Sequence, residues 1–412
     1  MQIQGQHRRV AFLRLLAMLA LLCNCLGCQK RAGAFSALDA LVAPYRFDFV
    51  RWELAALCGS AQPTVALPNS EEDASRLVLR YISLQRTAAS LQAQLDQEST
   101  SASASIDELQ SLRDEIASIK PQVERILAAQ VTAALQDEGI YTPADRYVRL
   151  GTTLPPVWFK LDTLPLLLVV SPRDRIESSY EAMLQQNLDL ATIVALEGSI
   201  DKQDFSALVV PLGGFGATYP SFVAEDADLR WMLRTISEEW LHQYLAFTPL
   251  GWRYVLDLTR IKPDYGIAAI NETVAGIVSQ EIADRVYDAH YAALVSRQPS
   301  SGTGLASSEE FDFRAEMHAT RLHVDALLAG GQVEEAERYM RERRDDFKEQ
   351  GYYIRKLNQA YFAFYGTYGD SPASSDPLGD QLRALRRTSP SLADFLNRVV
   401  EITSRDQLME MR

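Results

Sequence analysis

The spacing of apolar residues changes near Tyr141, and this change constrains the fold more than any other feature of the chain. From Ser36 to about Gly139, apolar residues recur at intervals of three and four, as on one face of an α-helix. A serine-rich stretch, Ser99–Ser105, divides this run and predicts the turn of a long antiparallel helical hairpin. Pro121 should break or kink its second helix. The hairpin is a packing element or, alternatively, a coiled coil that binds a partner.

After Tyr141 the apolar runs are short and are separated by Pro and Gly, so Val157 to Tyr219 predicts a small sheet with one helix. A helix capped by Asp226 or Asp228 follows, then another from about Asn271 to Arg297. The pattern therefore predicts an α+β fold that is predominantly α-helical. Its regions are 1–30, a signal peptide or membrane anchor; 36–140, the helical hairpin; 141–297, an α+β core; 298–310, a linker; and 311–412, a C-terminal helical region.

The composition is that of a globular protein, and its charge limits the class of partner. The chain has 412 residues, of which 47% are hydrophobic, and a formal net charge of -13. Nucleic-acid binding requires a basic surface that offsets phosphate charge. No Lys/Arg stripe interleaved with aromatic residues is present. The sequence thus argues against nucleic acid as a partner.

The N-terminal residues predict export and attachment to a membrane. Basic residues precede an apolar run, Val10–Gly27, as in a secretory signal or a membrane anchor; a buried core helix is the alternative. The "CLGC" that follows resembles a bacterial lipobox with Cys28 as the lipidated residue, although Cys25 stands where a leucine is expected. We therefore expect an extracytoplasmic protein, anchored or secreted. Only Cys58 lies beyond this segment, which excludes a disulfide framework and a zinc-thiolate site.

The stretch "ISEEWLHQYL" contains candidate metal-binding and catalytic residues. Glu238 and His242 are four residues apart, so they project from one face of a helix with Glu239 beside them. Two adjacent glutamates on a helix are usually solvated, but the apolar neighbours of this pair leave little polar face. The next helix offers Glu272, in "NETVA", as a third ligand. The alternative for Glu272 is an interaction with a helix N-terminus.

This order, a motif helix followed by a helix with Asn-Glu-x-x-Ala, resembles the gluzincin metallopeptidases. The resemblance covers about Leu154–Arg297 and implies a zincin-like core in which Glu238, His242 and Glu272 hold zinc. It also implies that Glu239 is the general base and that "PLGGFGATYP" includes the edge strand receiving the peptide. The C-terminal segments are similar to uncharacterised bacterial proteins of the aminopeptidase type. Tyr353 or Tyr361 is the oxyanion donor that the resemblance implies.

One residue departs from the family pattern, because Glu238 replaces the first histidine of the zinc motif. A ligand set of one His and two Glu is more anionic, so the ion should be a weaker Lewis acid and the site should shift in preference from zinc toward manganese or calcium, or hold no ion. His290 cannot replace the missing histidine, because it lies ~27 Å along the helix from Glu272 at 1.5 Å per residue. His318 and His323 could approach only through tertiary folding.

Three functions remain open at this point. The first is metal-dependent hydrolysis of a peptide or protein substrate, at reduced activity because of Glu238. The second is a pseudopeptidase that binds a peptide or protein without cutting it, and the third is a helical structural or interaction protein. A large separation between Glu272 and His242 would eliminate the first two functions together.

Overall fold

The structure is a computed structural model, and it describes residues 35–48, 52, 66–97, 103–144, 151–259, 261–262, 264–296, 311–367, 369 and 371–411. The predicted signal peptide or anchor, Cys28 and the predicted linker lie outside the described residues. Among those residues, no helix is long and apolar enough to cross a membrane.

The fold is α+β and predominantly helical, as predicted: of the described residues, 62% are in helices and 9% in strands. The helices are α2 (Ser36–Val42), η1 (Ala43–Tyr45), α4 (Glu71–Gln97), α5 (Ser103–Asp137), α6 (Leu190–Asp201), α7 (Leu229–Leu245), α8 (Pro249–Leu258), α9 (Tyr265–His290), α10 (Ala292–Ser296), α11 (Phe313–Ala329), α12 (Val333–Glu349), α13 (Gln359–Tyr365), α14 (Leu378–Thr388), α15 (Leu392–Val399) and α16 (Arg405–Glu410). The strands are β1 (Phe159–Asp162), β2 (Leu166–Pro172), β3 (Tyr180–Leu184), β4 (Phe205–Pro211), β5 (Gly214–Phe215) and β6 (Ser221–Ala224).

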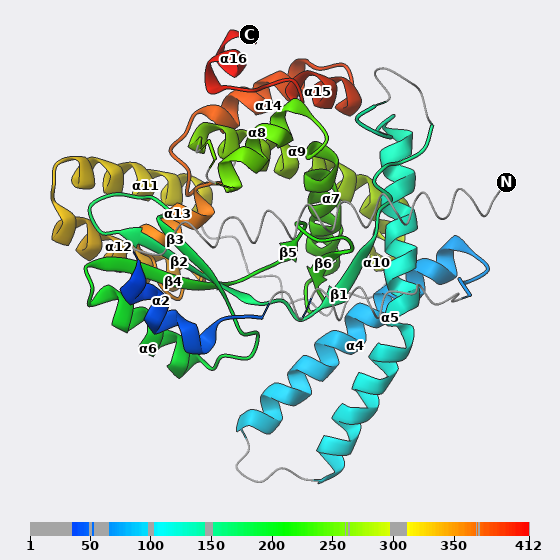
Figure 1. Ribbon diagram of the computed structural model, residues 1–412. Coiled ribbons are helices and arrows are strands. Elements are labelled where there is room, and N and C mark those ends of the chain that lie inside the picture. The colour runs from blue at the N-terminus through cyan, green and yellow to red at the C-terminus, as the bar shows by residue number, and fades with distance from the viewer. Residues whose placement is uncertain are drawn as a thin grey trace.

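The predicted hairpin is formed by α4 and α5, which pack along each other (Figure 1). Of the break or kink predicted at Pro121, the break is wrong, because α5 continues through this residue. A proline inside a helix costs about 3 kcal/mol. The contacts of α5 with α4, α7, α9 and β1 offset that cost. Its Glu124 also pairs with Lys160 of β1 at 2.7 Å and accepts a hydrogen bond from the amide of Leu161, which joins the hairpin to the core.

Two three-stranded sheets replace the single small sheet that the sequence predicts. In the first, with order β1-β6-β5, β1 and β6 are parallel and β5 is antiparallel to β6. The second, β3-β2-β4, is antiparallel. Helix α7 contacts β5 and β6, whereas α6 and α13 contact the second sheet. Strand β5 therefore lies at the end of its sheet and beside the motif helix.

The hydrophobic clusters do not follow the boundaries of the predicted regions. The largest cluster joins α4 and α5 to α7, α9 and the C-terminal helices α14 and α15. A separate cluster places Leu38 and Val42 of α2 against residues of the second sheet and α6. The start of the region predicted as a hairpin thus belongs to the second sheet.

Candidate metal centre

Two capped helices position the side chains of the candidate site. The carboxylate of Asp228 accepts a hydrogen bond from the amide of Trp231 and begins α7, which confirms one of the two caps that the sequence offers. Asp264 begins α9 in the same way, through the amide of Ile267. The two helices pack side by side in the largest core cluster (Figure 1).

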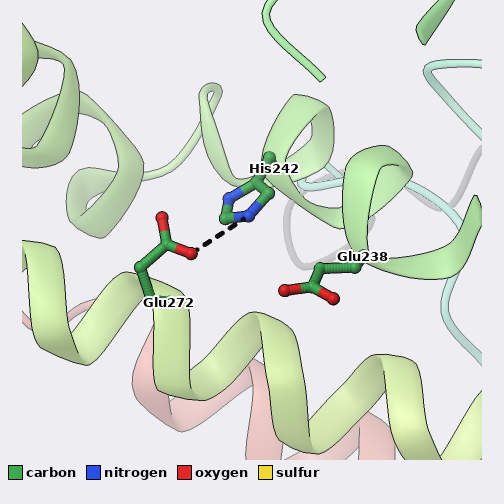
Figure 2. A group of neighbouring side chains, drawn as sticks. All are labelled: Glu238, His242 and Glu272. Atoms are coloured by element: carbon green, nitrogen blue, oxygen red, sulfur yellow. Dashed lines mark ion pairs between the residues drawn. The ribbon is translucent and has the colours of Figure 1, made fainter. Parts of the chain in front are cut away.

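The side chains of Glu238, His242 and Glu272 converge between these helices, as Figure 2 shows. Nε2 of His242 lies 3.6 Å from Oε2 of Glu272, and one ligand atom from each of the three residues lies within 4.8 Å of the other two. A tetrahedral zinc ion with bonds of 2.0–2.1 Å would separate its ligand atoms by about 3.3 Å. Small side-chain rotations would close this difference, so the group could hold a metal ion.

Two further side chains orient the ligands. Nδ1 of His242 lies 3.1 Å from Oδ1 of Asn271, an amide oxygen that can accept a hydrogen bond from a protonated Nδ1; in that tautomer Nε2 is available as a metal ligand atom. The hydroxyl of Tyr254 donates to Oε1 of Glu272 at 2.6 Å and leaves Oε2 facing the histidine. Metal-binding histidines and carboxylates usually have such partners.

Glu239 lies on the side of α7 that faces β5. A Cβ atom on Gly214 would lie 2.1 Å from one carboxylate oxygen of Glu239, and a Cβ atom on Gly216 would lie 2.4 Å from the other. A side chain at either position would displace the carboxyl group of Glu239, so the glycine-rich segment places its backbone directly against this group. The pKa of Glu239 is raised to about 8: burial is the largest cause, the positive charge of His242 opposes it, and the charges of Glu238 and Glu272 add to it.

The histidine responds to the same charges. Burial by itself lowers the pKa of His242, but the carboxylates of Glu272, Glu239 and Glu238 outweigh it and raise the pKa above its usual value. The surrounding carboxylates therefore favour positive charge at His242, which a bound cation would also supply.

The structure also places the other candidate residues. Glu272 lies seven residues inside α9, so the alternative interaction with a helix N-terminus does not apply. The predicted start of this helix, at about Asn271, was too late, because α9 begins at Tyr265. His290 ends the same continuous helix, while His318 bonds to the carbonyl of Ser374 and His323 packs on Tyr339.

The two tyrosines named as oxyanion donors lie in the C-terminal region. Tyr353 is 77% exposed, and Tyr361 packs against Tyr365 and Phe362. Among the described residues, no hydrogen bond joins either tyrosine to Glu238, His242 or Glu272. Their predicted role stays a prediction.

Sequence reasoning missed Asn271 and Tyr254. Asn271 directly precedes Glu272 in "NETVA", so its position beside a ligand was a usable signal. Tyr254 is one of 17 tyrosines in the chain and no spacing marks it. Its role becomes visible only when α8 packs against α9.

No model of a protein family, no curated protein and no solved structure matches the chain. The function is therefore argued from the site itself.

Proposed function

We propose that the chain is a zincin-like metallopeptidase of the extracytoplasmic space, associated with a membrane through its N-terminus. The observation that carries the proposal is the convergence of Glu238, His242 and Glu272 from two helices, with Asn271 and Tyr254 orienting two of them. These are one nitrogen and two carboxylate donors, which suit zinc or manganese. A large separation of Glu272 from His242 would have removed this function, and the structure brings them together.

The roles of the residues follow from where they lie. A bound zinc or manganese ion would polarise the peptide carbonyl and acidify a water molecule. Glu239, next to Glu238 on α7, would accept the proton of the attacking water and transfer it to the leaving amine. Strand β5 ends its sheet directly beside Glu239, so an extended peptide could pair with its outer edge.

A second candidate, a pseudopeptidase that binds a peptide without cutting it, is favoured by one observation. The ligand set contains Glu238 in place of a histidine, and a more anionic set weakens the ion as a Lewis acid. The same three residues could then hold an ion that organises the site without activating water.

Digestion of a proteome-derived peptide library, with products identified by mass spectrometry, separates the two functions. The wild-type protein, supplied with zinc or manganese, should cut peptides, and Glu239→Gln should lower the rate by about 10²- to 10⁴-fold. Glu238→His should raise activity with zinc. Cleavage by Glu239→Gln at the wild-type rate would refute the proposed role of Glu239. Peptide binding without cleavage in all three proteins would support the pseudopeptidase.

A further inference from the structure

A stripe of side chains continues from the metal ligands toward the N-terminus of α7. Trp231, Arg234, Glu238 and His242 follow one another at intervals of three, four and four residues, so they lie along one side of the helix. The side chain of Arg234 is 34% exposed and Trp231 is 38% exposed. This side of α7 is thus partly open to solvent from the metal ligands to its first turn.

Arg234 is weakly engaged by the rest of the fold. Among the described residues, its one ion pair joins Nε to Oε2 of Glu238 at 3.9 Å, and Nε is buried without a hydrogen bond. Such an arrangement is unfavourable for a guanidinium group, which is stabilised by short hydrogen bonds to a carboxylate.

Arg230, one turn earlier on α7, has close partners, unlike Arg234. It pairs with Asp284 at 3.1 Å and with Asp288 at 4.0 Å, and it stacks on the ring of Tyr287 at 3.6 Å. These contacts hold α7 against α9, so Arg230 has a structural role. Arg234 lacks equivalent contacts among the described residues and faces the metal ligands instead.

Trp231 forms the next part of the stripe. A Cβ atom on Gly213 would lie 2.1 Å from the indole ring, so the ring packs directly on the backbone just before β5. The aromatic side chain therefore spans from α7 to the strand that ends the sheet.

We propose that Arg234 binds a carboxylate group of the peptide substrate, in a subsite bounded by Trp231. This inference depends on the proposed function, since it assigns a preference to the same site. One helical turn, about 6 Å, separates Arg234 from Glu238, and an extended peptide advances about 3.3 Å per residue. The carboxylate thus belongs to a residue within two positions of the scissile bond, as an acidic side chain or as the C-terminus.

Binding of defined peptides tests this inference. Four fluorescein-labelled hexa-alanine peptides serve as probes: one with a free C-terminus, one with a C-terminal amide, and two amides with Glu or Gln at the fifth position. Fluorescence anisotropy is measured on zinc-supplied Glu239→Gln protein, in which cleavage is suppressed. At least one carboxylate-bearing peptide should bind about 10-fold more tightly than its neutral partner, because charge-assisted hydrogen bonds to Arg are strong. The better pair identifies the source of the carboxylate.

The variants separate recognition from folding. Arg234→Gln should reduce the difference within each pair to less than about twofold, Arg234→Lys should retain part of it, and the matched control Arg230→Gln should leave it unchanged. Equal binding within both pairs, failure of every peptide to bind, or a preference that survives Arg234→Gln would overturn the inference. Zinc content of the same samples reports on the proposed function separately: a carboxylate preference without bound zinc would contradict the metal site and not the role of Arg234.

Discussion

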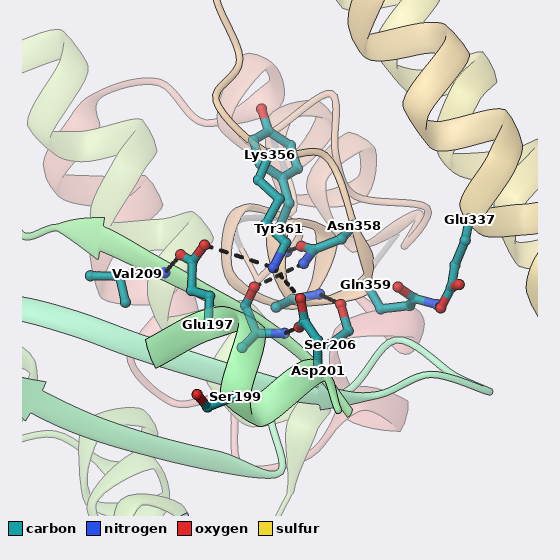
Figure 3. A network of polar contacts seen from close by, with 12 residues as sticks. Glu197, Ser199, Asp201, Ser206, Val209, Glu337, Lys356, Asn358, Gln359 and Tyr361 are labelled. Atoms are coloured by element: carbon teal, nitrogen blue, oxygen red, sulfur yellow. Dashed lines mark hydrogen bonds and ion pairs between the residues drawn. The ribbon is translucent and has the colours of Figure 1, made fainter. Parts of the chain in front are cut away.

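Two groups of carboxylates in this molecule have opposite surroundings. The first, which we call the acid cluster, contains Glu238, Glu239 and Glu272 with His242, between α7, α9 and β5. The second, the ion-pair network, lies where α6 and the second sheet meet the C-terminal region (Figure 3). It contains Glu197, Asp201 and Glu337 with Arg173, Arg355 and Lys356.

Each carboxylate of the ion-pair network has a close cation. Glu197, whose side chain is 4% exposed, accepts hydrogen bonds of 2.9 and 2.6 Å from Arg355 and one of 2.7 Å from the amide of Val209. Lys356 lies 2.8 Å from Asp201. Arg173 donates two hydrogen bonds, of 2.7 and 2.8 Å, to Glu337. This network joins β2, β4 and α6 to residues more than a hundred positions later in the chain.

Among the described residues, the acid cluster contains one histidine and lies near one arginine. Its carboxylates share His242, and the guanidinium of Arg234 remains 3.9 Å from Glu238. The pKa values differ accordingly: the hydrogen bond from Arg173 lowers the pKa of Glu337, whereas burial raises that of Glu239. Removing one partner of a paired carboxylate destabilises a fold, whereas a cluster of carboxylates with perturbed pKa values is typical of a binding or catalytic site.

The largest expected effect is in the ion-pair network. Arg355→Ala leaves Glu197 buried beside only the more distant Lys356, at 3.7 Å. Removing one partner of a buried pair should lower the free energy of unfolding by about 3 kcal/mol, measured by urea denaturation. Arg338→Ala is the matched control, because the Arg338–Glu335 pair is 59% and 40% exposed and should contribute less than about 1 kcal/mol. Equal losses in the two variants would refute the structural role of the network.

Asn271→Ala should show its effect in metal affinity. Loss of its carbonyl oxygen removes the group that orients the ring of His242, which should weaken zinc binding by about 10- to 100-fold in a chelator competition assay. The exposed Asn397, changed to Ala, is the control and should leave the affinity unchanged. Unchanged affinity in Asn271→Ala would show that this contact does not support a ligand.

Substitution of a glutamate in the acid cluster should change the free energy of unfolding in the opposite direction from the same substitution in the ion-pair network. Glu239→Gln removes one of three crowded carboxylates and should raise the free energy of unfolding of the metal-free protein by about 1 kcal/mol. Glu197→Gln, the same chemical change, should lower it, because Arg355 then loses its charged partner. If both substitutions destabilise the protein to the same extent, the two groups are energetically alike and the comparison fails.

The smallest effect is the acid dependence of the Arg173–Glu337 pair. The pKa of Glu337 is lower in the folded than in the unfolded protein, so its stabilisation is complete above the ordinary Glu value of about 4.3 and is lost as the pH falls below it. Both side chains are partly exposed, so the loss should be under about 1 kcal/mol. Urea denaturation at pH 6 and pH 3 measures it, and Glu337→Gln should lack this part of the pH dependence. A loss of the same size in that variant would assign it to other groups.

The site was more predictable than its surroundings. The i, i+4 spacing of Glu238 and His242 and the cap at Asp228 are local signals, so the sequence alone predicted the motif helix correctly. The contact of Tyr254 with Glu272 depends on how α8 packs against α9, and a single sequence has no signal for that. Similarly, Glu197 and Arg355 are 158 positions apart, and neither is marked by a neighbouring motif.

Metal content of the purified protein tests the central claim most directly. The purified protein, prepared without chelator and supplied with zinc or manganese, is analysed by inductively coupled plasma mass spectrometry beside His242→Ala and the control His290→Ala. We expect about one equivalent of metal in the wild-type protein and in the control, and none in His242→Ala. No metal in the wild-type protein, or the same content in His242→Ala, would contradict the assignment of Glu238, His242 and Glu272 as a metal site.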